Sequence, residues 1–144
     1  MNLHEYQSRD LLSQYNVNFP KGEVGSSPDE IYEIVKRFNC EVVVKVQIHS
    51  GGRGKAGGVK LCKTPEEAKF FADEMIGKRI VTDQTDSEGV IVEKLLVTEL
   101  TNISKEIYLS IIIDPDFEGP MMIASSDGGM DIEKLAEECP EKLI

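Results

Sequence analysis

Residues 50–59 read SGGRGKAGGV, and this stretch decides how the rest of the chain is interpreted. Five of the eight residues from Gly51 to Gly58 are glycine, so the backbone can approach a ligand closely and adopt positive φ angles without a Cβ clash. Successive free N–H groups in such a loop form a concave site for an anion. Arg53 and Lys55 add positive charge, and an arginine can hold two phosphate oxygens at once. The stretch therefore predicts a phosphate-binding loop.

The segments on both sides of the glycines have the pattern of strands. Apolar and polar residues alternate around Val42–Val46, and Val59–Cys62 follows the loop with no helix beginning before Thr64. A Walker A loop needs Ser or Thr after its lysine, but Lys55 is followed by Ala56. A Rossmann loop would open a helix, and the later motifs of a protein kinase are absent. We therefore expect a glycine-rich flap between two strands.

The distribution of charge supports an anionic ligand of small size. The 144 residues contain 16 Lys and Arg against 26 Asp and Glu, a net charge of −10, which disfavours binding to nucleic acid. No Asp or Glu occurs from Val42 to Pro65, and the same segment holds five cations: Lys45, Arg53, Lys55, Lys60 and Lys63. Because an acidic chain has no carboxylate in this one segment but keeps five cations there, we expect the segment to bind a small polyanion. The alternative is chance clustering on a solvated loop.

Composition is that of an ordinary soluble globular protein, and the cysteine pattern predicts a reducing cytoplasm. It is 40% hydrophobic and 29% charged, and no apolar run approaches the roughly 20 residues of a membrane helix. The N-terminus lacks the pattern of a secretory signal, so we expect no membrane association. The three cysteines, Cys40, Cys62 and Cys139, form no Cys-x-x-Cys pair, and His4 and His49 lack a second histidine at ligand spacing. We therefore expect free thiols and no metal site built from these residues.

Three helices are predicted with their starting residues, and a fourth is expected after Gly129. The first covers residues 2–15, with Asn2 and Glu5 as a capping box. The second and third begin after Ser27 and Thr64. The expected inner faces are Leu11, Leu12 and Tyr15; Ile31, Ile34, Val35 and Phe38; Ala68, Phe71, Ala72 and Met75; and Ile132, Leu135 and Ala136.

Strands are expected between these helices. Beyond the two that flank the glycine loop, they cover residues 80–82, 90–97, 107–113 and 121–124. The turn-rich residues 114–120 predict a hairpin between the last two. Because helices and strands intermix, the predicted class is α/β or α+β. The chain reads as one domain, residues 1–144, and we expect it to be the front part of something longer.

Two further positions attract attention as ligand-binding candidates. Lys45 lies inside an apolar strand just before the flap, so it either points to solvent from an edge strand or reaches a phosphate beneath the flap. Residues 97–106 interrupt two apolar segments, and the backbone of such a hinge could pair with the edge of an adenine base. Glu106 could then accept ribose hydroxyls. The alternative for the hinge is a plain connecting loop.

Several long motifs resemble one family. They are MNLHEYQ at residues 1–7, KVQIHSGGRGKAGG at 45–58, GKRIVT at 77–82 with Gln84 and Thr85, KEIYL at 105–109 and GGMDIE at 128–133. In this order they are similar to the β subunit of succinyl-CoA synthetase, also called succinate–CoA ligase. The resemblance covers the whole chain and implies the ATP-grasp fold, with this chain as the N-terminal part of that domain and no CoA-ligase domain.

The resemblance also implies an activity and a partner. The family converts succinate, CoA and ATP to succinyl-CoA, ADP and phosphate in the tricarboxylic acid cycle, through a phosphohistidine on an α subunit. Residues 19–20, Phe-Pro, are similar to the branch that uses adenine nucleotides. A related ATP-grasp acyl-CoA ligase, such as one acting on malate, and a non-catalytic nucleotide-binding module remain as alternatives.

Nucleotide-binding residues follow from the resemblance position by position. Lys45 is expected to contact the phosphates beneath a flap formed by Gly52, Arg53 and Gly54. The base is expected in the hinge, and Glu106 is expected to hold the ribose. The hinge residues are Thr98, Glu99 and Thr101, with the choice between Thr98 and Glu99 left open. The family's Mg²⁺ ligands, an Asn and an Asp, are expected beyond residue 144, so no metal ligand and no catalytic residue is assigned, and a chain of this length is expected to be incomplete for turnover.

Overall fold

The computed structural model describes residues 2–116, 118–129 and 139 of the chain. The chain forms two compact units, Met1–Thr101 and Asn102–Ile144. No helix among the described residues has the length and apolar character needed to span a membrane. The mixed helix and strand content agrees with the predicted class.

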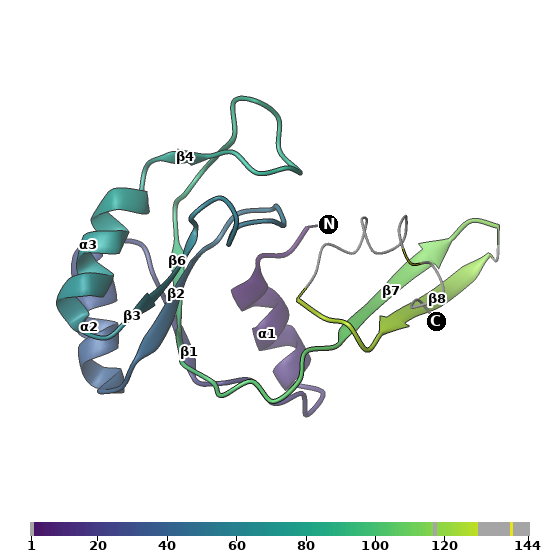
Figure 1. Cartoon of the computed structure of the whole chain (residues 1–144), viewed down its shortest axis with the longest axis horizontal. Helices are drawn as coiled ribbons and strands as arrows, with labels where there is room; N and C mark the ends of the chain where they lie inside the picture. The colour runs from purple at the N-terminus through teal and green to yellow at the C-terminus, as the bar shows by residue number, and fades with distance from the viewer. Residues whose placement is uncertain (1, 117, 130–138, 140–144) are drawn as a thin grey trace. The chain divides into compact units, whose positions relative to one another are not determined.

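The first unit is built on a four-stranded antiparallel sheet (Figure 1). Its strands occur in the order β1-β6-β2-β3, so β2 is paired on both sides. Val43 faces Thr98 on one side and Leu61 on the other. The bounds are β1 Gly22–Gly25, β6 Leu95–Glu99, β2 Val42–Val46 and β3 Val59–Cys62.

Two capped helices cover one face of this sheet (Figure 1). They are α2, Pro28–Phe38, and α3, Pro65–Met75. The side chains of Ser27 and Thr64 accept hydrogen bonds from the backbone three residues later, which confirms both predicted N-caps. Gly77 has φ of +82° just beyond α3, as a residue that ends a helix in the left-handed conformation does.

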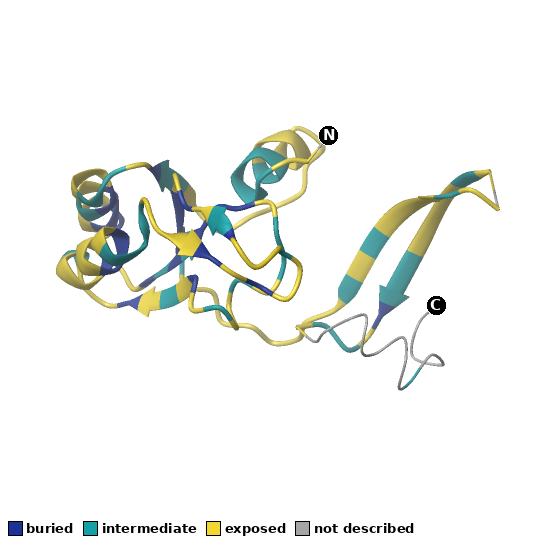
Figure 2. Ribbon diagram, turned by 90° about the horizontal axis from the view of Figure 1, so that it is seen from above, coloured by how far each residue is buried: buried dark blue, intermediate teal, exposed yellow. Residues whose placement is uncertain are grey.

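The core lies between these two helices and the sheet, and Figure 2 shows it as the dark blue interior of the first unit. All four residues of the α2 stripe are buried, together with three of the four on α3, while Met75 packs partly buried against them. Val42, Val44 and Val46 of β2 are fully buried beneath the helices. Since β2 alternates, Val43 and Lys45 face the opposite side of the sheet.

The first helix differs from its prediction. α1 covers Glu5–Ser13, and its N-cap is His4 rather than Asn2. The His4 backbone N–H donates to Gln7 Oε1 at 2.9 Å, so the reciprocal cap is shifted two residues along the chain. α1 lies on the side of the sheet away from α2 and α3 (Figure 1). It has no buried residue, and the predicted inner face is wrong: Leu11, Leu12 and Tyr15 are exposed because no described residue covers them.

Some strand bounds also differ. The expected strand over residues 90–97 is two strands, β5 Val90–Ile91 and β6, separated by residues 92–94. β5 pairs with β4, Arg79–Ile80, in a small sheet of its own. β1 was missed because GEVG offers a single apolar side chain between glycines. The expected helix carrying Ile132, Leu135 and Ala136 lies outside the described residues.

The second unit contains the predicted hairpin. β7, Tyr108–Asp114, pairs antiparallel with β8, Gly119–Ser125, around the turn-rich residues that were expected to join them. Apolar side chains on both faces of β7 are exposed, with Ile111 at 66% and Ile112 at 41%. The hairpin is therefore unusually apolar for a surface element.

Replacing Ile31 by alanine tests the assignment of the core. Ile31 is fully buried, so the cavity should lower the free energy of unfolding by about 3 kcal/mol in urea denaturation followed by circular dichroism. Ile91→Ala is the control, because Ile91 is 45% exposed and its loss should cost less than about 1 kcal/mol. Equal losses in the two variants would contradict the assignment.

Candidate functional site

The glycine loop connects β2 to β3 and is held by its own backbone. The Gly58 N–H donates to the Arg53 carbonyl at 2.7 Å, and the Ala56 N–H donates to the Gly52 carbonyl at 3.1 Å. Gly52 and Gly57 have φ of +70° and +77°, a conformation that L side chains rarely adopt. The Val46 N–H donates to the Gly58 carbonyl at 2.8 Å, which closes the base of the loop. The predicted arrangement of strand, glycine loop and antiparallel strand is confirmed.

The tip of this loop is open. The backbone N–H groups of Gly52, Arg53 and Gly54 donate to no other residue in the described part of the chain. Gly52 and Gly54 are exposed, and a Cβ atom added to Gly54 would meet nothing within 4 Å. These N–H groups can therefore receive an anion without breaking an existing hydrogen bond to a described residue.

A second loop braces the start of the glycine loop. The Gly51 N–H donates to Gln84 Oε1 at 2.8 Å, and the hydroxyls of Ser50 and Thr82 are 2.5 Å apart. Thr82 and Gln84 lie between β4 and β5. The brace fixes the backbone at residues 50–51 while leaving Gly52–Gly54 free to contact a ligand.

The two cations proposed for phosphate binding meet at one carboxylate. Lys45 Nζ lies 3.1 Å from Glu5 Oε1, and Arg53 Nη2 lies 2.8 Å from Glu5 Oε2. Arg53 Nη1 also donates to the Val46 carbonyl at 2.8 Å. Local sequence pattern does not indicate this role of Glu5, because Glu5 lies 40 residues from Lys45 and 48 from Arg53. One feature of the sequence does indicate that such a residue exists. Because no Asp or Glu lies near these cations in the sequence, their counter-ion has to come from elsewhere in the chain.

Electrostatics keep Glu5 ionised. Burial raises the pKa of its carboxyl, but the charge of Lys45 and the hydrogen bonds from Arg53 and Lys45 outweigh burial and hold the pKa below its ordinary value. All three side chains are about three quarters buried, so the contact is only partly screened by water. The cluster has a net charge of +1, which leaves it attractive to anions.

Glu5 is held in place by contacts between α1 and the end of β2. The Tyr6 N–H donates to Gln47 Oε1 at 3.2 Å, and Gln47 is buried. Because α1 contacts both Lys45 and Gln47, these two side chains lie on the same face of the sheet. The rings of His4 and His49 stack with their centroids 3.9 Å apart. Burial first, and then the neighbouring His49 and Lys94, lowers the pKa of His4.

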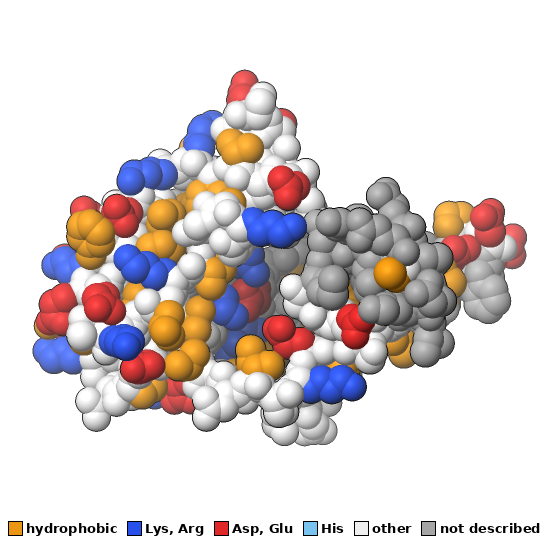
Figure 3. Space-filling view, in the orientation of Figure 1, with side chains coloured by type: hydrophobic (Ala, Val, Ile, Leu, Met, Phe, Trp, Pro, Cys, Tyr) orange, Lys and Arg blue, Asp and Glu red, His pale blue; other side chains and the backbone are white. Residues whose placement is uncertain are grey.

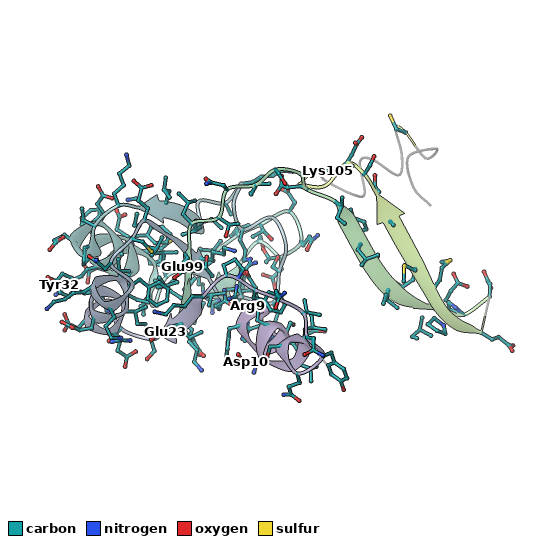
Figure 4. The ribbon with its side chains drawn as sticks, turned by 90° about the horizontal axis from the view of Figure 1, so that it is seen from below. Arg9, Asp10, Glu23, Tyr32, Glu99 and Lys105 are labelled. Atoms are coloured by element: carbon teal, nitrogen blue, oxygen red, sulfur yellow. The ribbon has the colours of Figure 1, made fainter. Side chains whose placement is uncertain are left out.

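The middle of α1 is fixed to the segment before β1. Arg9, labelled in Figure 4, donates to the Pro20 carbonyl and lies 5.1 Å from the centroid of the Phe19 ring. Contacts at its first turn and at its middle therefore hold α1 in place, although none of its residues is fully buried. They restrict where the Glu5 carboxylate can lie.

The predicted hinge is partly a strand. Thr98 and Glu99 belong to β6, and only Thr101 lies after it. Thr98 is buried and its hydroxyl donates to the Val43 carbonyl at 3.5 Å. The Glu99 N–H donates to the Lys21 carbonyl at 3.0 Å, so the hinge exposes fewer backbone groups than expected because the sheet has already paired them. The side chain of Glu99, labelled in Figure 4, remains half-buried at the end of β6.

Glu106 belongs to the second unit. Within that unit its carbonyl accepts a hydrogen bond from the Gly128 N–H at 3.1 Å. Its carboxylate lies against Gly129, where an added Cβ would clash with Oε2. Glu106 is exposed and available to a ligand.

A cavity of about 540 Å³ lies beside the cluster and is lined by Glu5, His49, Ser50, Arg53 and Gln84, among others. Over the face drawn in Figure 3, Lys and Arg side chains are interspersed with Asp and Glu on the first unit. The described residues contain no group of three or more His, Cys, Asp and Glu side chains that could hold a metal ion. The three cysteines are free thiols, and burial raises the pKa of Cys62 to about 11.

Comparison with known proteins gives one family. The model of the ATP-grasp domain matches residues 2–144. The chain is 49% identical over 145 residues to the protein of Wolinella succinogenes named succinate–CoA ligase [ADP-forming] subunit beta. It is 48% identical over 149 residues to the protein of that name in Chlorobium limicola. Both alignments cover all of this chain, which spans 37% and 38% of the relatives' lengths.

Solved structures share the fold. Acetyl-coenzyme A synthetase 1 of Ca. Korarchaeum cryptofilum, solved with coenzyme A and Ca-AMPCP, matches with a TM-score of 0.70 at 21% identity, over 86% of this chain and 53% of that one. ATP citrate lyase of Methanothrix soehngenii matches with a TM-score of 0.69 at 24% identity, over 99% of this chain and 33% of that one.

Two glycines of the loop should respond differently to alanine. At Gly58 an added Cβ would lie 2.6 Å from Val46 Cγ2 and 3.1 Å from the Arg53 carbonyl oxygen, so Gly58→Ala should lower the free energy of unfolding by about 1–3 kcal/mol. Gly54→Ala should change it by about 0.5 kcal/mol or less, because its Cβ meets nothing. Urea denaturation of both variants checks the loop geometry. A stability loss at Gly54 as large as at Gly58 would show that the geometry is wrong.

The contact made by Glu5 should depend on pH. A carboxyl with a lowered pKa stabilises the fold above its unfolded pKa, and this contribution disappears as pH falls through the folded pKa. Glu5→Gln should therefore lower the free energy of unfolding by about 1 kcal/mol at pH 7. As the pH falls into the acidic range, the difference in unfolding free energy between the variant and the original chain should disappear. Urea denaturation across pH measures this. A gap that stays constant or widens on acidification would count against the ion pairs.

Proposed function

This chain belongs to the ATP-grasp domain family, and we propose that it is the nucleotide-binding part of the β subunit of an ADP-forming succinate–CoA ligase. The whole-length identity to proteins of that name supports the assignment, although the chain spans less than two fifths of their length. The reaction proposed for the complete enzyme converts ATP, succinate and CoA to ADP, phosphate and succinyl-CoA.

One observation carries the proposal for the phosphate end of the nucleotide. Lys45 and Arg53 converge on Glu5, next to a loop whose N–H groups at Gly52–Gly54 are open. In our proposal the Lys45 ammonium and the Arg53 guanidinium neutralise the phosphate oxygens, and the loop N–H groups complete the site. Each charge-assisted hydrogen bond contributes about 1.5–3 kcal/mol, so a few suffice to order the ligand.

We propose that the base and ribose bind at and beyond the end of β6. Thr98 and Glu99 are both candidates for the base: Thr98 is buried on the face of Lys45, whereas Glu99 pairs with Val42 and is half-buried on the face of α2 and α3. Thr101 is exposed and is proposed to contribute to the same pocket. Glu106 is proposed to accept hydrogen bonds from the ribose hydroxyls, since an ionised carboxylate is an acceptor on both oxygens.

The proposed partner is an α subunit that carries the phosphohistidine, which the designation "beta" of the relatives supports. We propose that Mg²⁺ accompanies the nucleotide, which membership of the ATP-grasp family supports, and we assign none of its ligands to the described residues. The cytoplasm is the proposed compartment, and the free thiols are consistent with a reducing environment. Turnover that depends on Mg²⁺ and on an added α subunit, measured with the complete β subunit, would separate this proposal from a purely binding module. The same assay with succinate and with malate would identify the acid.

Lys45→Ala and Arg53→Ala should each weaken ATP binding about tenfold at low salt, measured by isothermal titration calorimetry. The effect should be smaller at high salt, because salt screens the attraction over about 8–10 Å. Lys36→Ala is the matched control, since Lys36 is exposed on α2 and pairs with Glu33. Unchanged affinity in the Lys45 and Arg53 variants would remove their phosphate role.

A further inference from the structure

Glu5 uses its two oxygens on two different cations. Oε1 lies 3.1 Å from Lys45 Nζ and Oε2 lies 2.8 Å from Arg53 Nη2, so one carboxylate fixes the ends of both side chains. Lys45 comes from β2 and Arg53 from the glycine loop. Glu5 comes from the first turn of α1, on the face of the sheet toward which Lys45 points. The three side chains border one another beside the cavity that contains Glu5 and Arg53.

The cluster still has donors to offer. Arg53 has five N–H groups and uses two of them, for Val46 and Glu5, and Lys45 has three and uses one, counting the contacts among described residues. A phosphate can therefore bind both cations while Glu5 stays where it is. Glu5 therefore differs from a competing anion, which the phosphate would have to displace before it could bind.

We propose that Glu5 is a positioning residue for polyphosphate binding: it holds Lys45 and Arg53 side by side so that both ammonium and guanidinium groups meet the same phosphate chain. The inference rests on the proposed nucleotide function of this site. Without Glu5 the two cations repel each other, and Arg53 keeps a single anchor at the Val46 carbonyl. The side chains must then be ordered by the ligand, which costs affinity.

The sign of the effect separates positioning from simple electrostatics. Removing a carboxylate adds one positive charge to the site, and attraction alone would then strengthen anion binding. Positioning predicts the opposite. Glu5→Gln should weaken binding about three- to tenfold. Each side chain that the ligand must immobilise raises the dissociation constant by up to about tenfold.

The test uses the full 144-residue chain and inorganic tripolyphosphate, a probe that lacks base and ribose. Its dissociation constant is measured by calorimetry for the original chain, Glu5→Gln and Glu5→Asp. Glu5→Asp keeps the charge but is one methylene shorter, so it should lie between the other two. Glu23→Gln is the matched control: it removes the same charge from an exposed ion pair with Arg37 and should leave the affinity unchanged.

Nitrogen NMR distinguishes a positioning role from a purely structural one, because it reports on the Arg53 side chain separately from the backbone. In Glu5→Gln the Arg53 Nε–H signal should shift toward that of a free arginine, while the backbone amide signals of β2 and β3 stay in place. Should Glu5→Gln fail to fold, Glu5→Asp provides the same comparison with the charge retained.

Four outcomes would overturn the inference. If the original chain does not bind tripolyphosphate, the proposed function fails and the positioning role fails with it. If the original chain binds and Glu5→Gln binds equally or more tightly, the positioning role alone is overturned. The same holds if Glu23→Gln is weakened as much as Glu5→Gln, or if the Arg53 signal does not change.

Discussion

The carboxylate of Glu5 between Lys45 and Arg53 is the contact on which this site depends. It joins α1, β2 and the glycine loop, three segments that local sequence does not bring together. Two like charges side by side are unfavourable unless an anion lies between them, and here the chain supplies that anion itself. The open N–H groups at Gly52–Gly54 then lie beside cations whose direction is already set. A site prepared in this way loses less conformational entropy when a phosphate binds.

The sheet explains why the loop can be both glycine-rich and fixed. β2 is buried on one face by α2 and α3 and paired on both edges, so its end at Val46 is rigid. The loop begins from this rigid end, is closed by the hydrogen bond between Val46 and Gly58, and is braced at Gly51 by Gln84. Rigid anchors on both sides let Gly52 and Gly54 be exposed without being loosely held.

Much of this could be predicted from local pattern. The caps at Ser27 and Thr64, the stripes behind them, and the strands that flank the loop follow from periodicity and capping chemistry, which act within a few residues. The role of Glu5, the burial of Gln47 and the pairing of β1 with β6 depend on contacts between segments far apart, which no local pattern contains. For the same reason the expected inner face of α1 was wrong, since its apolar spacing does not specify whether anything covers it. Of the predicted site residues, Lys45 and Arg53 are brought together, whereas Glu106 lies in the other unit.

A crystal structure of the chain with ADP would show whether Lys45, Arg53 and the glycine loop bind the phosphates. We expect phosphate oxygens within about 2.7–3.2 Å of Lys45 Nζ, of the Arg53 guanidinium and of the N–H groups at Gly52–Gly54, with Glu5 still in contact with both cations. Diphosphate density in any other part of the molecule, with these groups left uncontacted, would contradict it.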